Sequence, residues 1–557
     1  TIKSGNDVNI SGSLVGSNGN TVIKAENDIN IKNDVNSVYV ESNQKRSGFL
    51  SSYKKETRDY TEQAVGSNIV GNNVVLKAGD DVNVQASNLI GKKDENGNGG
   101  NIYITSGDDV NIIEGTLDES HYSYEKKSGF STNFSGGLGG ITGGITYSTS
   151  KTKQTSEMTN VAVSQVIADG DVIINAGDTV ESHATKFKAD DMSVVAENDI
   201  KLLDAQETYE QDYSNKTTSI GVSVSISSPI TSLINTGVNV RNNIKDDSYG
   251  FDRQDQSINT LFNGFQDIRD IARDNSIIRE TIAGKRKPTD LVDVSIGVNF
   301  STSSTTSHQE GTNSVAGTID VNNLNLTSNN GNVELVNQQV NVAQNMNVKA
   351  DDFIVRAGKS TFESENSSRS AGAGVSFNPL APITPANFTP SVNYSQSNVN
   401  MEGTTYNNSH ITVGGNTTIN TTGDMILSGA DLVTNTIDGN IGGQLIIESL
   451  QDTVTGSNSG FGANISLPTV AEKKNAETGK DTPAHRSPTV GGSVTDGSVD
   501  KTWTSDQSSL IAKNGGTINV GSTTTVTGAV VVSENVDKPL IINTTELITN
   551  NLEDSDE

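Results

Sequence analysis

"GNDVNISGSLVGSNGNTVIKAENDINI", residues 5–31, states one short pattern twice. In its first copy, Val8 and Ile10 flank Asn9 directly after an acidic residue. Because successive side chains of a strand point to opposite faces, Val8 and Ile10 share one face and Asn9 lies on the other. The stretch therefore predicts short β-strands that each bury one aliphatic face.

The same pattern recurs along the chain, which indicates a repeat architecture. Its copies share Asp, an aliphatic residue, a polar residue and a second aliphatic residue, at residues 7–10, 28–31, 81–84, 109–112 and, more loosely, 199–202. A period of about 20 residues is typical of a solenoid. One copy cannot bury its aliphatic face alone, but copies coiled side by side in parallel bury a continuous column. We predict an all-β fold, a right-handed parallel β-helix with rungs about 4.8 Å apart.

Composition agrees with a thin core. Only 32% of the 557 residues are hydrophobic and 5% aromatic, whereas 54 are Gly. The 39 basic and 67 acidic residues give a net charge of −28, which disfavours nucleic acid and anionic membrane surfaces as partners. Cysteine is absent, which excludes disulfides, thiolate metal sites and cysteine nucleophiles. No run approaches the roughly 20 apolar residues of a membrane-spanning helix.

Five excursions interrupt the repeat, at about residues 37–65, 114–163, 204–315, 362–407 and 449–512. The first two share Lys/Arg-Ser-Gly-Phe, at residues 46–49 and 127–130. Outgoing and returning alternating runs, such as 220–226 and 294–300, predict antiparallel β-hairpins that stand off the repeat. Their apolar faces can meet a partner or a membrane, or can pack on the repeat or on a neighbouring hairpin. We expect packing, because an exposed apolar strip promotes aggregation.

The third excursion contains a segment with helical periodicity. In "QSINTLFNGFQDIRDIARDNSIIRETIAGKRKP" apolar residues recur at i, i+3 and i+4, which predicts one helical insert at about 253–285. Gly284 and Pro288 end it. The polar face mixes Asp with Arg, unlike a membrane-surface helix. The basic cluster at 285–287 is too short to indicate nucleic-acid binding.

We expect no catalytic, cofactor or metal site. The Asp of "GDDVN" can bind calcium, but the paired-glycine calcium pattern is missing, and the simpler interpretation is that Asp accepts backbone N–H groups at a turn. Acidic residues repeat at turns rather than converge, so a polysaccharide-cleaving β-helix enzyme is only a minor alternative. The histidines are scattered; they are His121, His183, His308, His410 and His485.

"GGQLIIESLQDTVTGSNSGFGANIS", residues 442–466, resembles a signature of the haemagglutinin-repeat region of two-partner-secreted exoproteins. That family includes contact-dependent growth inhibition proteins of the CdiA type and filamentous-haemagglutinin-like adhesins. The similarity includes Glu-Ser-Leu-Gln-Asp-Thr at 448–453 and Gly-Phe-Gly-Ala at 460–463. The rungs and excursions resemble the same repeats, so we treat residues 1–557 as a single region.

The resemblance implies a secreted protein at the bacterial cell surface, associated with the outer membrane and exported by an outer-membrane two-partner transporter. The region would be a non-catalytic delivery module that helps a C-terminal toxin cross the target-cell outer membrane, with that membrane or a surface receptor as partner. An adhesin rod that binds a host receptor or matrix is the alternative. Thr1 begins within a repeat and Glu557 lies where the repeats would end. We therefore expect a piece of a longer chain that lacks the toxin.

Overall fold

The computed structural model describes residues 1–137, 140–227, 293–379, 387–470, 473–474, 481–482 and 485–556. Within these ranges every regular element is a β-strand, and most sheet pairings are parallel. The all-β prediction is confirmed, and the arrangement is consistent with a β-helix. The predicted helical insert at about 253–285 lies outside the described residues. No helix in the described part of the chain is long and apolar enough to cross a membrane.

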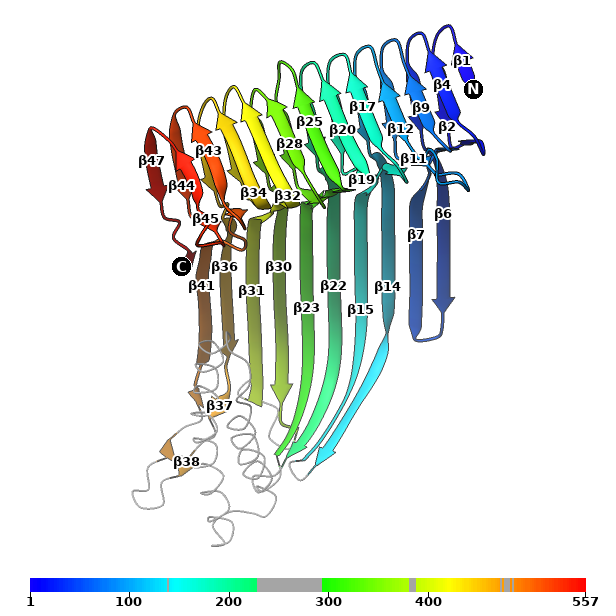
Figure 1. Cartoon of the computed structure of the whole chain (residues 1–557). Coiled ribbons are helices and arrows are strands. Elements are labelled where there is room, and N and C mark those ends of the chain that lie inside the picture. The colour runs from blue at the N-terminus through cyan, green and yellow to red at the C-terminus, as the bar shows by residue number, and fades with distance from the viewer. Residues whose placement is uncertain are drawn as a thin grey trace.

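Successive repeats stack their short strands in three parallel columns, which we call the rod (Figure 1). The first column is a parallel sheet that contains the repeated pattern of the sequence. Its strands are β2 (Val8–Ser11), β5 (Ile29–Lys32), β10 (Val82–Gln85), β13 (Val110–Ile113), β18 (Val180–His183), β21 (Ile200–Leu203), β26 (Val333–Val336), β29 (Phe353–Arg356), β33 (Met425–Ser428), β35 (Leu445–Glu448), β44 (Thr523–Thr527) and β47 (Glu546–Asn550).

The other two columns are joined in one 21-stranded sheet, because β32 and β34 each contribute to both. Its strands are β1 (Ile2–Ser4), β3 (Leu14–Gly16), β4 (Thr21–Ala25), β8 (Asn68–Gly71), β9 (Val74–Lys77), β11 (Asn88–Gly91), β12 (Ile102–Thr105), β16 (Gln165–Ala168), β17 (Val172–Ala176), β19 (Lys186–Lys188), β20 (Asp191–Ala196), β24 (Gly317–Val321), β25 (Asn323–Ser328), β27 (Gln338–Val342), β28 (Met346–Ala350), β32 (Ser409–Thr421), β34 (Ala430–Ile441), β42 (Ser509–Ala512), β43 (Gly516–Val520), β45 (Val530–Ser533) and β46 (Leu540–Asn543).

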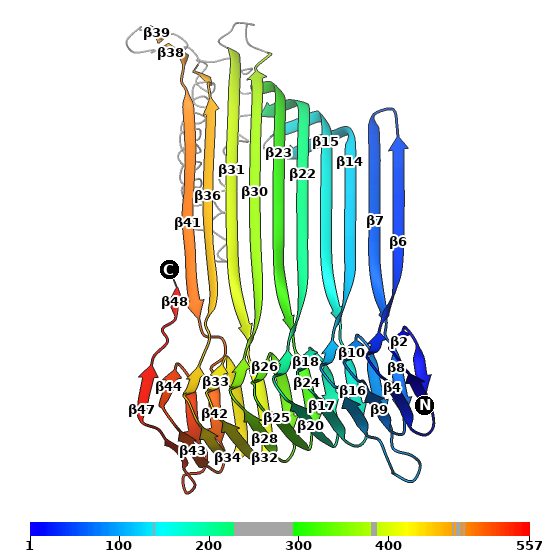
Figure 2. The same ribbon diagram turned by 90° about the horizontal axis from the view of Figure 1, so that it is seen from above.

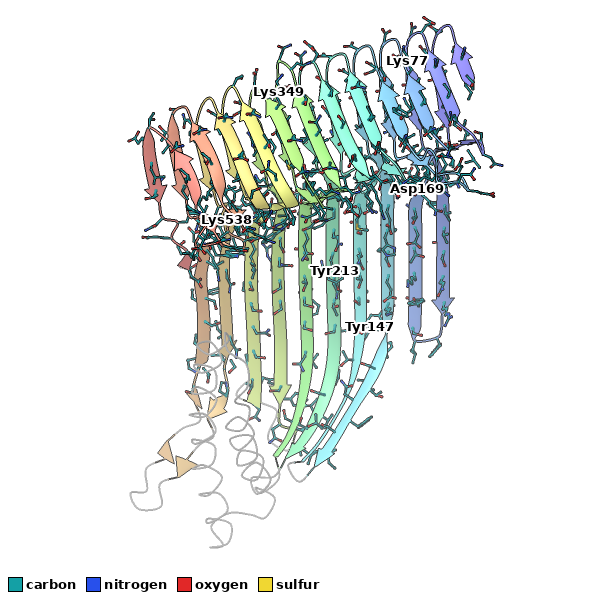
Figure 3. All side chains as sticks on the ribbon, viewed as in Figure 1. Lys77, Tyr147, Asp169, Tyr213, Lys349 and Lys538 are labelled. Carbon is teal, nitrogen blue, oxygen red and sulfur yellow. The ribbon has the colours of Figure 1, made fainter. Side chains whose placement is uncertain are left out.

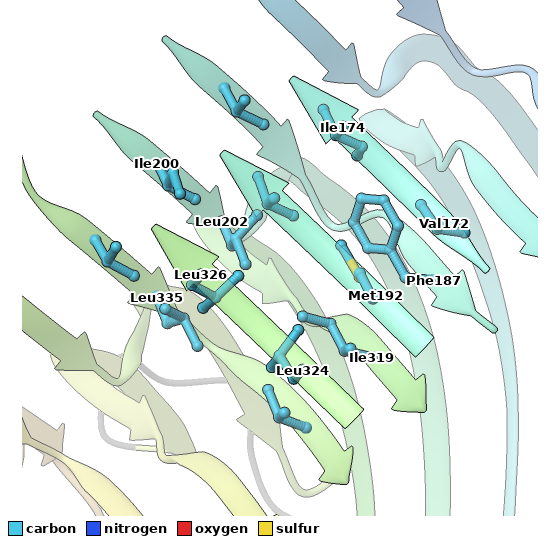
Figure 4. Packing of buried hydrophobic residues seen from close by; sticks show 14 of the residues in the cluster. Val172, Ile174, Phe187, Met192, Ile200, Leu202, Ile319, Leu324, Leu326 and Leu335 are labelled. Atoms are coloured by element: carbon cyan, nitrogen blue, oxygen red, sulfur yellow. The ribbon is translucent and has the colours of Figure 1, made fainter. Parts of the chain in front are cut away.

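The core is an aliphatic stack along the rod. Ile29, Val82, Val110 and Val180 occupy successive positions of one register and are buried. Larger side chains fill the middle of the rod, where Phe187 lies among aliphatic neighbours (Figure 4). Each such burial contributes about 1.5–3 kcal/mol relative to exposure, so a thin stack suffices when it is repeated many times.

Polar ladders run beside the core. The Asn30 amide donates to Asn9 at 3.1 Å and accepts from Asn83 at 3.0 Å. The acidic position of the repeat has a different role, since one Asp81 carboxylate oxygen accepts the backbone N–H of Asp109 at 3.0 Å. The interpretation that these aspartates accept backbone N–H groups is confirmed, and each one links its turn to the next.

Long strands project from the rod in five antiparallel pairs (Figures 1 and 2). The pairs join edge to edge in one antiparallel sheet, the projecting sheet, to whose end the short β48 (Ser555–Asp556) adds. They are β6 (Asp34–Ser47) with β7 (Ser51–Val65), β14 (Gly115–Gly137) with β15 (Gly140–Ala162), β22 (Ala205–Ser227) with β23 (Asp293–Val315), β30 (Gly358–Phe377) with β31 (Phe388–Asn407), and β36 (Asp452–Ser466) with β41 (Thr489–Trp503). Two small pairs complete the list, β37 (Thr469–Val470) with β40 (His485–Arg486) and β38 (Lys473–Lys474) with β39 (Asp481–Thr482).

The spacing of the rod explains why the pairs form one sheet. A pair leaves the rod between β5 and β8, whereas the next turn passes directly from β10 to β11, and this alternation continues along the rod. Two turns occupy twice the strand spacing of about 4.8 Å, and a pair of strands needs the same width. Each pair therefore reaches hydrogen-bonding distance of its neighbours.

The expectation that the apolar faces pack on the rod or on a neighbour is wrong. Neighbouring pairs meet through backbone hydrogen bonds at their edges, so their faces lie side by side instead of against each other. Ile145, Ile220 and Phe300 remain about half exposed, at 54%, 52% and 47%.

Candidate interaction surface

One face of the projecting sheet carries residues of different chemistry in bands. On β22 the side chains of Thr208, Glu210, Lys216 and Ile220 share this face, because they are an even number of residues apart in a strand whose pairing has no register shift. We call it the banded face. It runs from threonine next to the rod, through acidic and basic residues, to apolar residues at the far end.

Two ladders lie next to the rod. The threonine ladder crosses seven adjacent strands at one level, and the glutamate ladder crosses five of them two residues further out. Like charges directly opposite each other on neighbouring strands are destabilising. A groove of about 940 Å³ lies between the ladders. The threonine ladder is Thr159, Thr208, Thr312, Thr361, Thr404, Thr453 and Thr502, and the glutamate ladder is Glu157, Glu210, Glu310, Glu363 and Glu402.

His308 on β23 lies beside the glutamate ladder. Its Nδ1 is 2.8 Å from an Asp212 oxygen on β22, and its Nε2 is 3.6 Å from Glu310 on its own strand. Glu365 lies opposite it on β30. The hydrogen bond to Asp212 raises the pKa of the His308 imidazole, and the negative charges of Asp212, Glu310 and Glu210 add to this. The imidazolium is thus the form that this part of the face stabilises.

The outer part of the banded face is apolar. Phe130, Tyr147, Ile220 and Phe300 follow one another across four adjacent strands, and the rings of Phe130 and Tyr147 lie 4.9 Å apart. We call the exposed hydrophobic residues at this level of the banded face, and those further from the rod, the apolar area. They are Phe130, Phe134, Ile141, Ile145, Tyr147, Ile220, Val222, Val224, Ile226, Val298, Phe300, Val375, Val392, Ile465 and Val490. The opposite face at the same level carries Ser, Thr, Gly and Asn. The outer sheet is therefore amphipathic.

The four histidines whose side chains the structure describes do not form one cluster. His121 lies 2.5 Å from Asp59 on the projecting sheet, and His183 lies 2.9 Å from Glu114 and from Glu181 at the base of the sheet. The side chain of His485 lies outside the described residues. In the described ranges, three groups place possible metal-ligand atoms within 4.8 Å of one another; they are Glu210–Asp212–His308, His410–Asp431–Asp506 and Asp108–Asp109–Asp178.

Sequence reasoning did not identify the ladders, although the sequence contains a signal for them. Five strands carry Glu-x-Thr or Thr-x-Glu, at residues 157–159, 208–210, 310–312, 361–363 and 402–404. The motif runs in opposite directions on outgoing and returning strands, as expected when antiparallel strands place the same chemistry at one level. It becomes visible only when the strands are aligned antiparallel.

A family model of the hemagglutinin repeat matches residues 47–157, 145–249 and 298–463, which is more than half of the chain. The chain belongs to the hemagglutinin-repeat family. This confirms the resemblance noted in the sequence. The matched ranges include most of the long strands, so the projecting sheet is built mainly from hemagglutinin repeats.

Relatives of the same kind are similar over most of the chain. The tRNA nuclease CdiA of Escherichia coli strain NC101 is 24% identical over 445 residues, which are 74% of this chain and 12% of that protein. The deoxyribonuclease CdiA of Dickeya dadantii strain 3937 is 26% identical over 424 residues, which are 73% of this chain and 12% of that protein. The chain thus spans about an eighth of the length of these curated relatives. No solved structure matches.

These matches place the chain among secreted or cell-surface exoproteins with adhesin-like hemagglutinin repeats, the class to which contact-dependent growth inhibition proteins belong. The hemagglutinin repeat is a structural unit. The nuclease activities in the names above are those of the relatives.

Proposed function

We propose that this chain is a right-handed parallel β-helix that serves as a non-catalytic delivery region of a large secreted exoprotein. Residues 1–557 form one region of the parent protein, which an outer-membrane two-partner transporter exports to the cell surface. The region contacts the outer membrane of a target cell while a C-terminal toxin of the parent protein crosses it. The similarity to CdiA nucleases supports this role.

The observation that carries the proposal is the apolar area on the projecting sheet. Its side chains are roughly half exposed and continuous across adjacent strands, and monomeric soluble proteins rarely expose large contiguous apolar patches except at interaction sites. The opposite face at the same level is polar, so the outer sheet can place one face against lipid and leave the other in water.

Vesicle flotation tests this role. The chain is mixed with phosphatidylcholine vesicles, and the floating fraction is compared with that of I220S/F300S. We expect the double variant to partition at least about tenfold more weakly, because each change removes a large apolar side chain from the contact. S219A/S301A is the matched control on the opposite face of the same strands, where the two hydroxyl oxygens lie 2.6 Å apart.

The control variant should float like the unmodified chain. If the unmodified chain stays in solution with vesicles, and remains fully accessible to protease when mixed with target cells, the delivery role is contradicted. If I220S/F300S floats as well as the control, the apolar area is not the contact surface.

The groove between the threonine and glutamate ladders favours a second function, an adhesin rod that binds a host receptor or matrix. Its walls are hydroxyl and carboxylate groups, which are suited to hydrogen-bonding a polar ligand. An adhesin would bind cells through that groove, so T312V/T361V would reduce binding to cells without affecting vesicle flotation. For a delivery region, I220S/F300S would reduce vesicle flotation, and T312V/T361V would leave binding to cells unchanged.

A further inference from the structure

A row of lysines crosses the banded face between the acidic and apolar residues. The register places one lysine from each of five adjacent strands directly opposite the next, and neighbouring residues at such positions are about 5 Å apart. The lysine ladder consists of Lys45 on β6, Lys54 on β7, Lys126 on β14, Lys151 on β15 and Lys216 on β22. Arg369 on β30 lies at the same level beyond Ser304.

These charges are poorly neutralised. Lys54 lies 3.3 Å from Glu56, but the other four lysines and Arg369 have no ion pair within the described residues. Like charges placed directly opposite each other destabilise a sheet. The chain carries a net charge of −28, so carboxylates are abundant, yet they are absent from this ladder. A partner with several negative charges would neutralise these lysines and remove their mutual repulsion.

Two of the lysines belong to a motif that the sequence repeats. Lys45 and Lys126 each begin a Lys-Arg/Lys-Ser-Gly-Phe segment. In the second copy Phe130 follows Lys126 by four residues on the same face, so the motif supplies one residue to the lysine ladder and one to the apolar area. In this copy one short motif thus contributes to both features.

The distance between the lysine ladder and the apolar area points to the chemistry of the partner. Lys216 lies four residues from Ile220, and Lys151 lies four residues from Tyr147, which is about 13 Å along an extended strand. Headgroup layers are several ångströms thick on each side of the hydrocarbon core, and lysine side chains extend toward them while their stems lie on apolar surface. When the apolar area contacts acyl chains, the ammonium groups reach the level of the lipid phosphates.

We infer that the lysine ladder binds the phosphate groups of anionic lipid headgroups and thereby holds the sheet at the membrane beside the apolar area. This inference rests on the delivery function proposed above and adds the chemistry of the lipid. It also explains how so acidic a chain approaches an anionic surface, since the acidic ladder lies on the rod side of the lysine ladder and away from the lipid.

The test compares two triple variants on vesicles with and without phosphatidylglycerol. K126Q/K151Q/K216Q removes three ladder charges. K24Q/K77Q/K349Q removes three exposed charges from the rod, where Lys77 and Lys349 lie far from the projecting strands that carry Tyr147 and Tyr213 (Figure 3). Both variants change the net charge equally. Thermal unfolding checks that each one folds, which is expected because all six lysines are at least partly exposed.

We expect the ladder variant to bind phosphatidylglycerol vesicles about 100-fold more weakly than the rod variant, because each basic residue near an anionic surface strengthens binding severalfold. Binding to phosphatidylcholine vesicles should be the same for both. Added salt should reduce the difference, because it screens exposed charges.

The outcomes separate the two proposals. Equal binding of both triple variants to anionic vesicles overturns the lysine ladder as a lipid site but leaves the delivery role intact if I220S/F300S still loses flotation. The delivery role itself is contradicted if the unmodified chain binds neither vesicle type and stays fully accessible to protease on target cells. If inorganic phosphate at the concentration of the lipid phosphate displaces the chain from anionic vesicles, the ladder is a site for free phosphate and the lipid assignment is wrong.

Discussion

Leu89→Ala tests the claim that stability in the rod is local to each turn. Leu89 on β11 is fully buried, with Ile69 on β8 and Val166 on β16 in register on either side. Leu→Ala at buried sites costs about 2.7–5 kcal/mol, depending on how far the cavity collapses. We expect at least about 3 kcal/mol here, because the neighbouring turns hold the backbone, restrict collapse and so leave a cavity.

Hydrogen exchange followed by mass spectrometry measures where that free energy is lost. In a stack of repeats each turn contacts only its neighbours, so protection should fall in β8, β11 and β16 and stay unchanged at the far end, for example in β43. A loss of about 3 kcal/mol makes the locally open, exchange-competent state roughly 150-fold more populated.

Leu14→Ala is the matched control, since Leu14 on β3 lies on the same column but is 74% exposed. Its effect should stay within about 0.5 kcal/mol. Equal losses for Leu14→Ala and Leu89→Ala, or a loss from Leu89→Ala spread evenly along the rod, would refute the aliphatic stack as the source of local stability.

Three more predictions concern the turns and the ladders. Gly107→Ala should lower the free energy of urea unfolding by about 1–3 kcal/mol, because the new methyl group would overlap the Gly79 carbonyl. Gly5→Ala, which has open space around it, should change the free energy of unfolding little. Equal effects would contradict the close stacking of turns. Glu363→Gln should stabilise the projecting sheet by about 0.2–1 kcal/mol at neutral pH, because it removes a carboxylate that lies directly between those of Glu310 and Glu402. A destabilisation would contradict the repulsion. The pKa of His308 is raised in the folded chain, so the stabilisation by its charged form is fully present below the unfolded pKa of about 6.5 and is lost as the pH rises through the folded pKa. His308→Gln should therefore flatten the pH dependence of the unfolding midpoint in that range. An unchanged profile would exclude a contribution from His308.

The candidate surface could be predicted only in part. Alternation of apolar and polar residues in 220–226 predicts one apolar strand face from the sequence, because side-chain period is a local property. Which residues of other strands lie beside Ile220 is not local. Lys54 lies opposite Lys126, and Lys151 lies opposite Lys216, although many residues separate the two members of each pair. They become neighbours only through the lengths and starting points of the strands that carry them.

The sequence by itself determined the all-β class and the stacking of the rod. Val8, Ile29 and Val82 each repeat the same short pattern, and identical patterns bury their aliphatic side chains best when they stack in register. Tertiary structure alone decided that the projecting strands form one sheet with a banded face. That outcome depends on a match between two lengths, the rise of two turns of the rod and the width of two paired strands, which no single segment of the chain contains.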